Sequence, residues 1–409
     1  MRRLTILVLG LFLSVPAIFG GGYQVHLHGA RNIGMGLIGT SLSYDASTLF
    51  YNPGATPFLE NKWNFSGGVS LLFSRVTFQP DQVAEQYHLE HQLNTPLYFY
   101  AAYKITKDLS VGLAVNTPYG NGLSWGKDWK GKYLIQDLTF RAFTFQPTVS
   151  YKYKDIFGIG VGLVYAYGNV NLNKAIPLQG STGDGQLNIQ GSTGNFGFNA
   201  GILVKPLKGL SLGVNYRSKI EMKVKGADAV FTVPQSLGAS FPANKVETML
   251  PLPANLDFGA SYEFGKNKQW MVGLNLCYVF WNTYDSLVFD FETKTTSVGR
   301  SASPALYESK LIPRIGVQYK MNDLLAFRIG GYYDPSPVKD DYLNPQTPSL
   351  NQVGLTCGVS VYPLKGLSVD ASFLYITGEE RKGTFSPDNF AGTYKNQVFI
   401  PGIGLTYNF

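Results

Sequence analysis

The sequence predicts an all-β protein: a 14-stranded antiparallel transmembrane β-barrel with an N-terminal hatch that plugs its lumen. Three observations predict this fold. Many segments alternate apolar and polar residues with period two, as residues 210–216 do. The connections between these segments alternate between short turns and long loops. Charged residues make up only 15% of the chain and aromatic residues 14%, which is too little charge for a surface that water covers on all sides.

Residues 1–20 are typical of a secretory signal peptide. Arg2 and Arg3 precede an apolar stretch from Leu4 to Val15, and small residues suited to cleavage follow. The alternative is that this segment stays in place as an anchor. No later uncharged apolar run reaches the roughly 20 residues that a membrane-spanning helix needs. We therefore expect an exported chain, composed of a signal peptide (1–20), a hatch (21–62) and a barrel (63–409), that crosses its membrane with strands.

The net charge bears on the kind of partner, and the two cysteines bear on whether a disulfide forms. The formal net charge is +7, with no block of Lys and Arg and no basic helix, so nothing favours a nucleic-acid partner. The strand alternation puts Cys277 on a polar face and Cys357 on an apolar face. We therefore expect two free thiols and no disulfide.

The strands share a large, aromatic apolar face and a polar opposite face, as residues 143–153 show. Short turns are expected at 104–108, 154–155, 205–209, 264–268, 320–323 and 363–366, and longer loops elsewhere. An even number of strands with both ends in the periplasm requires this alternation, whereas a soluble all-β domain does not. The expected strands are 63–75, 96–104, 109–117, 141–153, 156–169, 192–205, 210–225, 248–264, 269–281, 310–320, 324–333, 353–362, 367–378 and 396–409.

The segment before the first strand is expected to fill the lumen. Several glycines point inward on the strand alternation, among them Gly112, Gly158, Gly213 and Gly330, and they leave space that another segment must occupy. Residues 43–55 begin with possible helix-capping residues and end in an Asn-Pro turn signal. We expect a short helix followed by a compact turn.

Motifs in the hatch and barrel resemble those of the FadL/TodX-type outer-membrane transporters of fatty acids and hydrocarbons, over essentially the whole mature chain. The resemblance implies fourteen strands, a hatch ending in Asn-Pro-Ala, and a kinked third strand that opens a lateral route into the bilayer. Here the hatch motif is Asn52, Pro53, Gly54 and Ala55, and Gly54 departs from the family's Ala, which implies a looser or differently seated turn. The motifs are Gly34-Met35-Gly36, Asp45-Ala46-Ser47-Thr48, Phe50-Tyr51-Asn52-Pro53, Thr117-Pro118-Tyr119-Gly120, Trp129-Lys130-Gly131-Lys132-Tyr133, Tyr216-Arg217-Ser218, Gly330-Gly331-Tyr332-Tyr333-Asp334 and Tyr407-Asn408-Phe409.

Within the third strand, Gly112 is the candidate for the kink, because glycine inside a strand marks bends and bulges. The alternative is that Gly112 only makes space beneath the hatch.

A fatty-acid carboxylate in the lumen would need a charged partner. Arg217, Arg314 and Arg328 point inward on the alternation, and Lys174 and Lys310 lie near the outer rim. These five are the candidate ligand-binding cations. The alternatives are that the arginines pair with inward carboxylates or with the hatch, and that the lysines only keep the loops solvated. The family's carboxylate-binding cations have no definite counterparts in this sequence.

Aromatic residues of the long loops could form an outer capture groove for apolar ligands, in which each buried methylene contributes about 0.8 kcal/mol. The candidates are Tyr87, Trp125, Trp129 and Tyr133. The alternative for the two tryptophans is an interfacial aromatic girdle.

The four histidines do not suggest an enzyme. All lie in the hatch or the first long loop, and none lies on a lumen strand that would hold a catalytic base rigidly. His26 and His28 are too few to bind a metal without further ligands, so we expect no metal and no cofactor.

The sequence thus predicts a passive outer-membrane transporter of a Gram-negative-type bacterium that takes up long-chain fatty acids or similar hydrophobic molecules. Outer-membrane lipid and lipopolysaccharide would surround it, and the short N-terminal segment shows no domain for an energy-coupling partner. Three alternatives stay open: a structural or surface-interaction barrel such as an adhesin or phage receptor, a channel specific for aromatic hydrocarbons, and an open pore for polar solutes.

Overall fold

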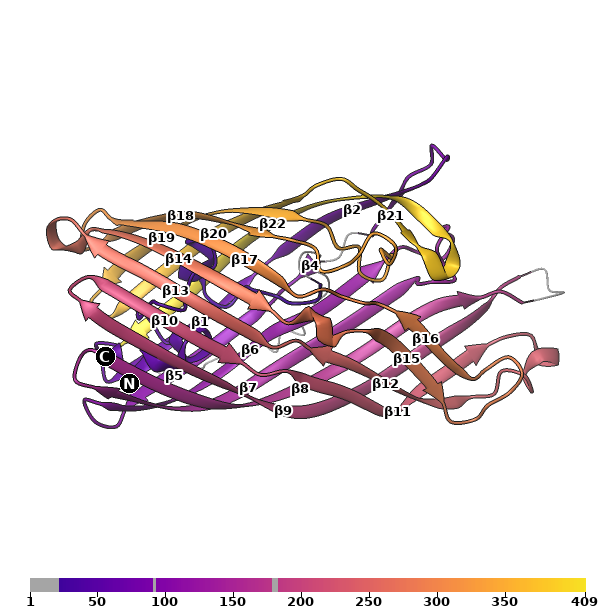
Figure 1. The fold of residues 1–409 in the computed structure, drawn as a ribbon, viewed down its shortest axis with the longest axis horizontal. Helices are drawn as coiled ribbons and strands as arrows, with labels where there is room; N and C mark the ends of the chain where they lie inside the picture. Colours follow the sequence, from indigo (N-terminus) through magenta and orange to yellow (C-terminus); the bar gives the residue numbers. More distant parts are fainter. Residues whose placement is uncertain (1–21, 91–92, 179–182) are drawn as a thin grey trace, which may run out of the picture.

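The computed structural model describes residues 22–90, 93–178 and 183–409, so the expected signal peptide lies outside the described residues. The wall is a closed antiparallel barrel of 14 strands. It closes where the first strand segment, β1 (Trp63–Ser70), pairs with the last, β22 (Phe390–Asn408), with Asn64 opposite Asn408. Short turns lie at the end that carries the C-terminus, and long loops extend from the other end (Figure 1). The predicted fold class is therefore confirmed.

Several barrel strands are divided into two segments by a bend, and β8 and β9 extend well beyond their predicted limits. Two short strands, β3 (Tyr87–His88) and β4 (Leu93–Asn94), belong to the first outer loop. The remaining wall segments are β2 (Leu72–Pro80), β5 (Leu97–Lys104), β6 (Leu109–Ser124), β7 (Asp137–Tyr153), β8 (Phe157–Ile176), β9 (Gly185–Leu207), β10 (Leu210–Arg217), β11 (Ile220–Thr232), β12 (Asn244–Leu252), β13 (Asn255–Phe264), β14 (Trp270–Val279), β15 (Ser286–Phe291), β16 (Arg300–Pro304), β17 (Lys310–Lys320), β18 (Leu325–Asp334), β19 (Gln352–Leu364), β20 (Leu367–Gly378) and β21 (Arg381–Phe385).

The outer face of the wall is apolar, as period-two alternation requires. Residues such as Val161, Leu163 and Ile315 are more than half exposed, while their strand neighbours point into the lumen. Cys277 is buried and Cys357 is exposed, and both are free thiols, as predicted. Short 3-10 turns occur in the connections: η2 (Gln235–Leu237), η3 (Lys266–Lys268), η4 (Trp281–Thr283) and η5 (Ser386–Asp388).

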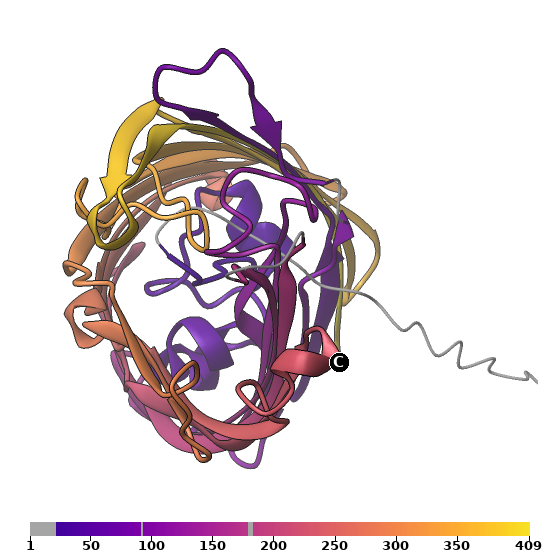
Figure 2. The ribbon, with the colours of Figure 1, turned by 90° about the vertical axis from the view of Figure 1, so that its right-hand side faces the viewer.

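The hatch lies inside the ring of strands (Figure 2). It contains α1 (Ala30–Gly34), α2 (Thr48–Tyr51) and η1 (Pro53–Phe58). Inward glycines of the wall make room for it: a Cβ on Gly213 would overlap the backbone of Thr40, and one on Gly316 would overlap Met35. No helix within the described residues is long and apolar enough to cross a membrane.

Candidate functional site

The hatch motif is fixed to the wall by Asn52. Its side-chain nitrogen donates to the carbonyl oxygens of Thr40, at 2.6 Å, and of Ile202 on β9, at 2.9 Å. Its side-chain oxygen accepts a hydrogen bond from the Gly54 backbone N–H at 3.0 Å and so caps the start of η1. One buried amide therefore joins two parts of the hatch to the barrel.

Gly54 packs against two glycines of the wall. A Cβ at this position would lie 2.6 Å from the carbonyl oxygen of Gly201 and 2.9 Å from that of Gly158, both of which are backbone atoms. An alanine would therefore not fit without a backbone shift. The departure from the family pattern gives a closely seated turn in this chain rather than a loose one.

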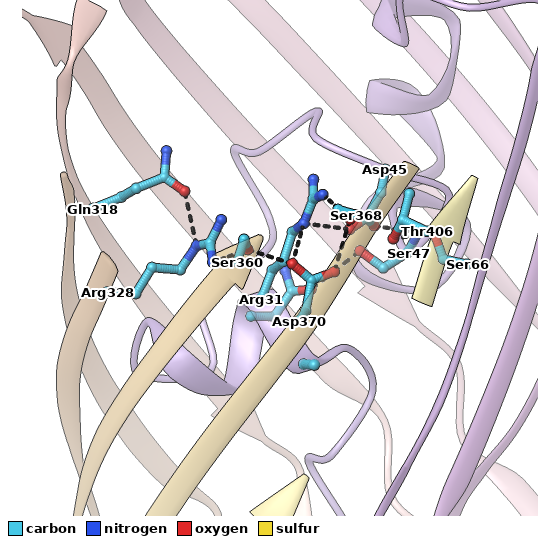
Figure 3. Close-up of polar contacts among 12 residues, drawn as sticks. Arg31, Asp45, Ser47, Ser66, Gln318, Arg328, Ser360, Ser368, Asp370 and Thr406 are labelled. Carbon is cyan, nitrogen blue, oxygen red and sulfur yellow. Dashed lines mark hydrogen bonds and ion pairs between the residues drawn. The ribbon is translucent and has the colours of Figure 1, made fainter. Parts of the chain in front are cut away.

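A second anchor joins α1 to the last strands of the barrel (Figure 3). The Arg31 side chain forms an ion pair with Asp370 at 3.0 Å and lies 3.8 Å from Asp45 of the hatch. The same network occupies Arg328, which donates to Ser360 at 2.6 Å and to Gln318 at 2.8 Å. Ser360 in turn donates to Asp370. Arg328 thus contributes to the network that holds the hatch.

The other two inward arginines also contact the hatch. Arg217 donates to the Phe50 carbonyl oxygen at 3.0 Å and lies 4.1 Å from the centre of the Phe50 ring. Arg314 donates to the Leu37 carbonyl oxygen at 3.2 Å, and one of its nitrogens lies 3.3 Å from Nδ1 of His26. The alternation placed all three arginines in the lumen, but they do not converge on one site.

The rim lysines and the hatch histidines form no common site either. Lys310 pairs with Glu308 at 2.9 Å, and Lys174 lies opposite Leu187 near the outer end of β8. The His28 ring lies 3.9 Å from that of Phe50, and burial together with the nearby Arg217 lowers the pKa of His28 to about 3. Among the described residues, no group of three or more His, Cys, Asp or Glu could hold a metal ion.

The interruption in the third strand is not at Gly112. That residue stands in regular register between Ala102 and Thr148, and a Cβ on it would meet Leu49 of the hatch at 2.6 Å. The register shift lies farther along β6, between Asn116 and Tyr119. The physical reason is Pro118, which has no backbone N–H with which to continue the ladder.

Beyond this shift, β6 separates from β5 and pairs with the start of the hatch. Val25 donates its backbone N–H to the Pro118 carbonyl oxygen at 2.8 Å, and Gly120 donates to that of Tyr23 at 3.0 Å. The pairing of β6 with β5 ends at Asn116. From Pro118 to Gly120, β6 is therefore bonded to the hatch on the side where β5 would continue the ladder, while β7 pairs with its other side.

An apolar pocket lies in the outer half of the lumen, above the hatch. Its empty volume is about 980 Å³, counting space open to solvent. None of its lining residues is Lys, Arg, His, Asp or Glu. Among the residues that line it are Tyr23, Leu138, Phe140, Val170, Ile189, Met222, Leu250, Tyr284, Phe289 and Tyr307.

The candidate capture groove is not open in this structure. Trp125 and Trp129 stack on each other with ring centres 4.7 Å apart, and each is less than 5% exposed. Trp129 also packs against Tyr87 and Phe78, so these aromatic residues form a closed cluster beneath the loops instead of a groove or a lipid-facing girdle. Tyr133 is 41% exposed and donates to Asp184 at 2.7 Å. The sequence identified the aromatic residues but not their mutual packing.

A family model described as outer membrane protein transport protein (OMPP1/FadL/TodX) matches residues 12–409. The chain belongs to this family. FadL/TodX proteins are outer-membrane transporters of hydrophobic compounds, and this member is accordingly an outer-membrane β-barrel of a Gram-negative bacterium.

Relatives of this FadL/TodX-family barrel match along most of its length. A Neisseria meningitidis outer membrane protein is 22% identical, over 99% of this chain and 98% of that protein. The long-chain fatty acid transport protein of Salmonella typhi is also 22% identical, over 96% and 95%. Among solved structures, a Pseudomonas aeruginosa FadL homologue has a TM-score of 0.84 at 18% identity, over 95% of this chain and 100% of that one. The toluene transporter TodX of Pseudomonas putida has a TM-score of 0.74 at 17% identity, over 93% and 98%. At these low identities, the similarity to the solved structures shows a shared fold.

Sequence reasoning did not identify the residues that line the apolar pocket of this FadL/TodX-family barrel. Its lining comes from the hatch and from many strand and loop segments, among them β7, β8, β9, β11, β12 and β15. The alternation can mark a strand residue as inward, but it carries no information on the height at which that residue lies in the barrel, nor on the loop residues that complete the pocket.

Proposed function

We propose that this barrel takes up hydrophobic molecules passively, as a transporter and not an enzyme, and that its preferred cargo is uncharged. The observation that carries this proposal is the apolar pocket without any Lys, Arg or His in its lining. A carboxylate in such a pocket would lose its hydration without gaining a cationic partner, which is costly. A neutral hydrocarbon would bury apolar surface at about 25 cal/mol per Å² with no such cost.

The hydrogen bonds of the inward arginines also favour an uncharged cargo. Arg217, Arg314 and Arg328 each donate hydrogen bonds to the hatch or to the network beneath it. A carboxylate that bound the nitrogens already in use would have to displace contacts that seat the hatch, which leaves to it Arg314 Nε and Arg328 Nη2, both buried and without a partner among the described residues. These cations therefore serve better as structural anchors than as a fatty-acid site.

The release of the cargo is proposed to be lateral. The break between β5 and β6 beyond Asn116 lies beside the hatch, where the wall ladder ends. The opposite route leads below the hatch into a cavity with an empty volume of about 1740 Å³, lined by Lys205, Glu263, Lys320 and other polar residues. An apolar molecule gains nothing in this polar vestibule, so the membrane is the more favourable destination.

The test is a binding comparison between matched cargoes. Native mass spectrometry and calorimetry with toluene, dodecane and oleate should show binding of the neutral molecules at least tenfold tighter than that of oleate. Met222→Glu introduces a charge into the pocket lining and should abolish neutral binding. Lys223→Gln, at the exposed neighbour on the same strand, is the control and should not change it.

Three outcomes would overturn the proposal. Oleate could bind more tightly than the hydrocarbons and lose its affinity in an Arg217→Ala, Arg314→Ala double variant, which would assign a fatty-acid site to the arginines. No apolar ligand could bind at all, which would favour a surface-interaction barrel. Uptake into outer-membrane vesicles could require an energy source, which would contradict passive transport.

A further inference from the structure

The barrel wall contains a second break, on a different side from the one at β6. The strand β9 pairs with β10 as far as Asn199 opposite Arg217, and with β11 from Gln190 opposite Asp228. Between these points, residues 191–197 and 219–227, all of them described by the structure, form no ladder pairs with each other, although β9 stays paired with β8 and β11 with β12. We call this unpaired stretch the seam. Figure 1 shows β9 and β11 running next to each other along the same part of the wall.

Side chains close the seam in place of the backbone ladder. Thr193 donates its hydroxyl to the carbonyl oxygen of Lys223 at 2.7 Å, and the Asn195 amide donates to that of Glu221 at 2.9 Å. At the lower end, the Ser218 backbone N–H donates to the Phe198 carbonyl oxygen, and the Ser218 hydroxyl accepts from the Phe198 backbone N–H, both at 2.9 Å. Between its ends the seam is thus held by two side-chain hydrogen bonds, those of Thr193 and Asn195, where a regular ladder would form more.

The inner side of the seam opens on the apolar pocket. Thr193, Met222 and Val224 are all among the residues that line it. On β9, Gly191 and Gly197 have no side chains to fill the space, and Val224 and Ile220 lie against them from β11. Small and apolar groups, with the bridging side chains of Thr193 and Asn195, therefore separate the pocket from the outside at this level.

The outer side of the seam lies at the level of the membrane interface. Phe196, Phe198 and Tyr216 are exposed aromatic residues of the outer wall at the lower end of the seam, as in an interfacial belt. Immediately beyond them along β11, the outward positions become charged, with Lys219 and Lys223 both pairing with Glu221. The apolar band of the barrel therefore ends where the seam begins.

We propose that the seam is a lateral entrance through which uncharged apolar molecules dissolved in the outer leaflet reach the pocket. Separation of β9 from β11 at Thr193 and Asn195 connects the interface to the pocket without passage through the outer loops. The entrance is distinct from the break at β6, which lies in another part of the wall. This proposal rests on the proposed function, because it assigns the pocket as the destination of the cargo.

A disulfide across the seam tests the entrance. A Cβ on Gly191 would lie 2.6 Å from Cγ1 of Val224, so cysteines at both positions would have Cβ atoms within roughly 4 Å, which suits a disulfide. The variant Gly191→Cys, Val224→Cys should be made with Cys357→Ser, which removes the exposed native thiol. The pair Gly197→Cys, Ile220→Cys offers a second, independent lock, since a Cβ on Gly197 would lie 2.6 Å from Ile220.

The measurement is the rate at which a neutral fluorescent probe, N-phenyl-1-naphthylamine, reaches the pocket of protein in lipid vesicles. Arrival is followed by energy transfer from tryptophan, because Trp281 packs against the pocket residue Tyr23. The probe is supplied either dissolved in the bilayer or added from water. Oxidation of either lock should slow arrival from the bilayer at least fivefold, and reductant should restore it, while arrival from water should not change.

The matched control is Val149→Cys, Val161→Cys, which cross-links two lipid-facing residues in regular register on β7 and β8. It should slow neither route. A Thr193→Val, Asn195→Leu variant removes both bridging hydrogen bonds and should speed arrival from the bilayer at least twofold. Equal rates in the oxidised and reduced locks, or an equal loss for both routes, would overturn the lateral entrance while leaving the pocket's function intact. Failure of the reduced protein to bind the probe by either route would instead refute the proposed function, and the entrance with it.

Discussion

At Gly54 the hatch and the wall approach so closely that one methyl group decides the fit. Replacement by Val should unseat the turn, because its Cβ would lie 2.6 Å from a backbone oxygen of β9. Overpacking of this kind costs about 1–3 kcal/mol. Faster proteolysis of residues 22–62 and a larger conductance in planar bilayers would report the change. Gly67→Ala is the control, since its Cβ would meet no atom closer than 3.6 Å.

Asp370 carries a different residue-level prediction. Asp370→Ala leaves the Arg31 guanidinium buried, with Asp45 at 3.8 Å as its remaining charged neighbour. Removal of one partner from a buried pair typically costs about 3–5 kcal/mol. The unfolding temperature in detergent should fall clearly. Asp323→Ala breaks the exposed pair with Lys320 and should change little, so equal effects of the two variants would contradict the anchoring role.

The inward direction of Arg217, Arg314 and Arg328 could be predicted from alternation alone, and all three are buried. Their partners could not be predicted. Phe50 and Leu37 belong to a segment without regular alternation, and each is more than 160 residues away from its arginine in the sequence. Nothing in the local pattern relates positions so far apart.

At the level of the elements, the hatch should respond to acid. The folded-state pKa of His28 is lowered to about 3 by burial and by Arg217 and Arg314, below the ordinary value of 6.5. The released hatch therefore binds a proton that the seated hatch does not, and seating weakens as the pH falls from 6.5 towards 3. At pH 5 the free energy that favours the seated hatch is lower by about 2 kcal/mol, because each pH unit below 6.5 reduces it by about 1.4 kcal/mol.

Hydrogen exchange of residues 22–62, compared between pH 7 and pH 5, measures this effect. Exchange should increase roughly tenfold or more at pH 5 after correction for the intrinsic rate. His28→Phe keeps an aromatic ring against Phe50 and should reduce the response, while His26, whose pKa is also lowered by burial and by Arg314, should account for the remainder. His88→Gln, in the exposed first loop, should retain it. An unchanged response in His28→Phe would assign the acid sensitivity to another group.

The strands were predictable as elements, and the break in the third strand was not. Period-two alternation and the turn residues located all fourteen strands, because each signal is local. Gly112 was the predicted kink because it is a glycine inside a strand, yet the register shift occurs after Asn116. The proline at 118 was the better indicator, because an absent N–H interrupts a ladder whereas an absent side chain only makes space.

At the level of the whole molecule, the pocket and the seam depend on how strands are offset from one another. The seam arises because the two sides of the unpaired stretch differ in length. Pairing stops at Asn199 opposite Arg217 and resumes at Gln190 opposite Asp228, so the side from β10 to β11 is two residues longer than the β9 side. Gly226, with a φ of +66°, lies within the extra length on the longer side. Such an offset between two segments cannot be read from either segment alone.

The closure of the barrel between β1 and β22 has a consequence for folding. Asn64 and Asn408 lie opposite each other, so the pairing that completes the wall joins the first strand to the last one synthesised. The hatch precedes β1 in the chain, and its anchor Arg31 contacts β20, two segments before the end of the wall. Contacts this distant in sequence form slowly, because a long loop must be ordered first. Closure of the wall and anchoring of the hatch at Asp370 therefore both wait for the last strands of the chain.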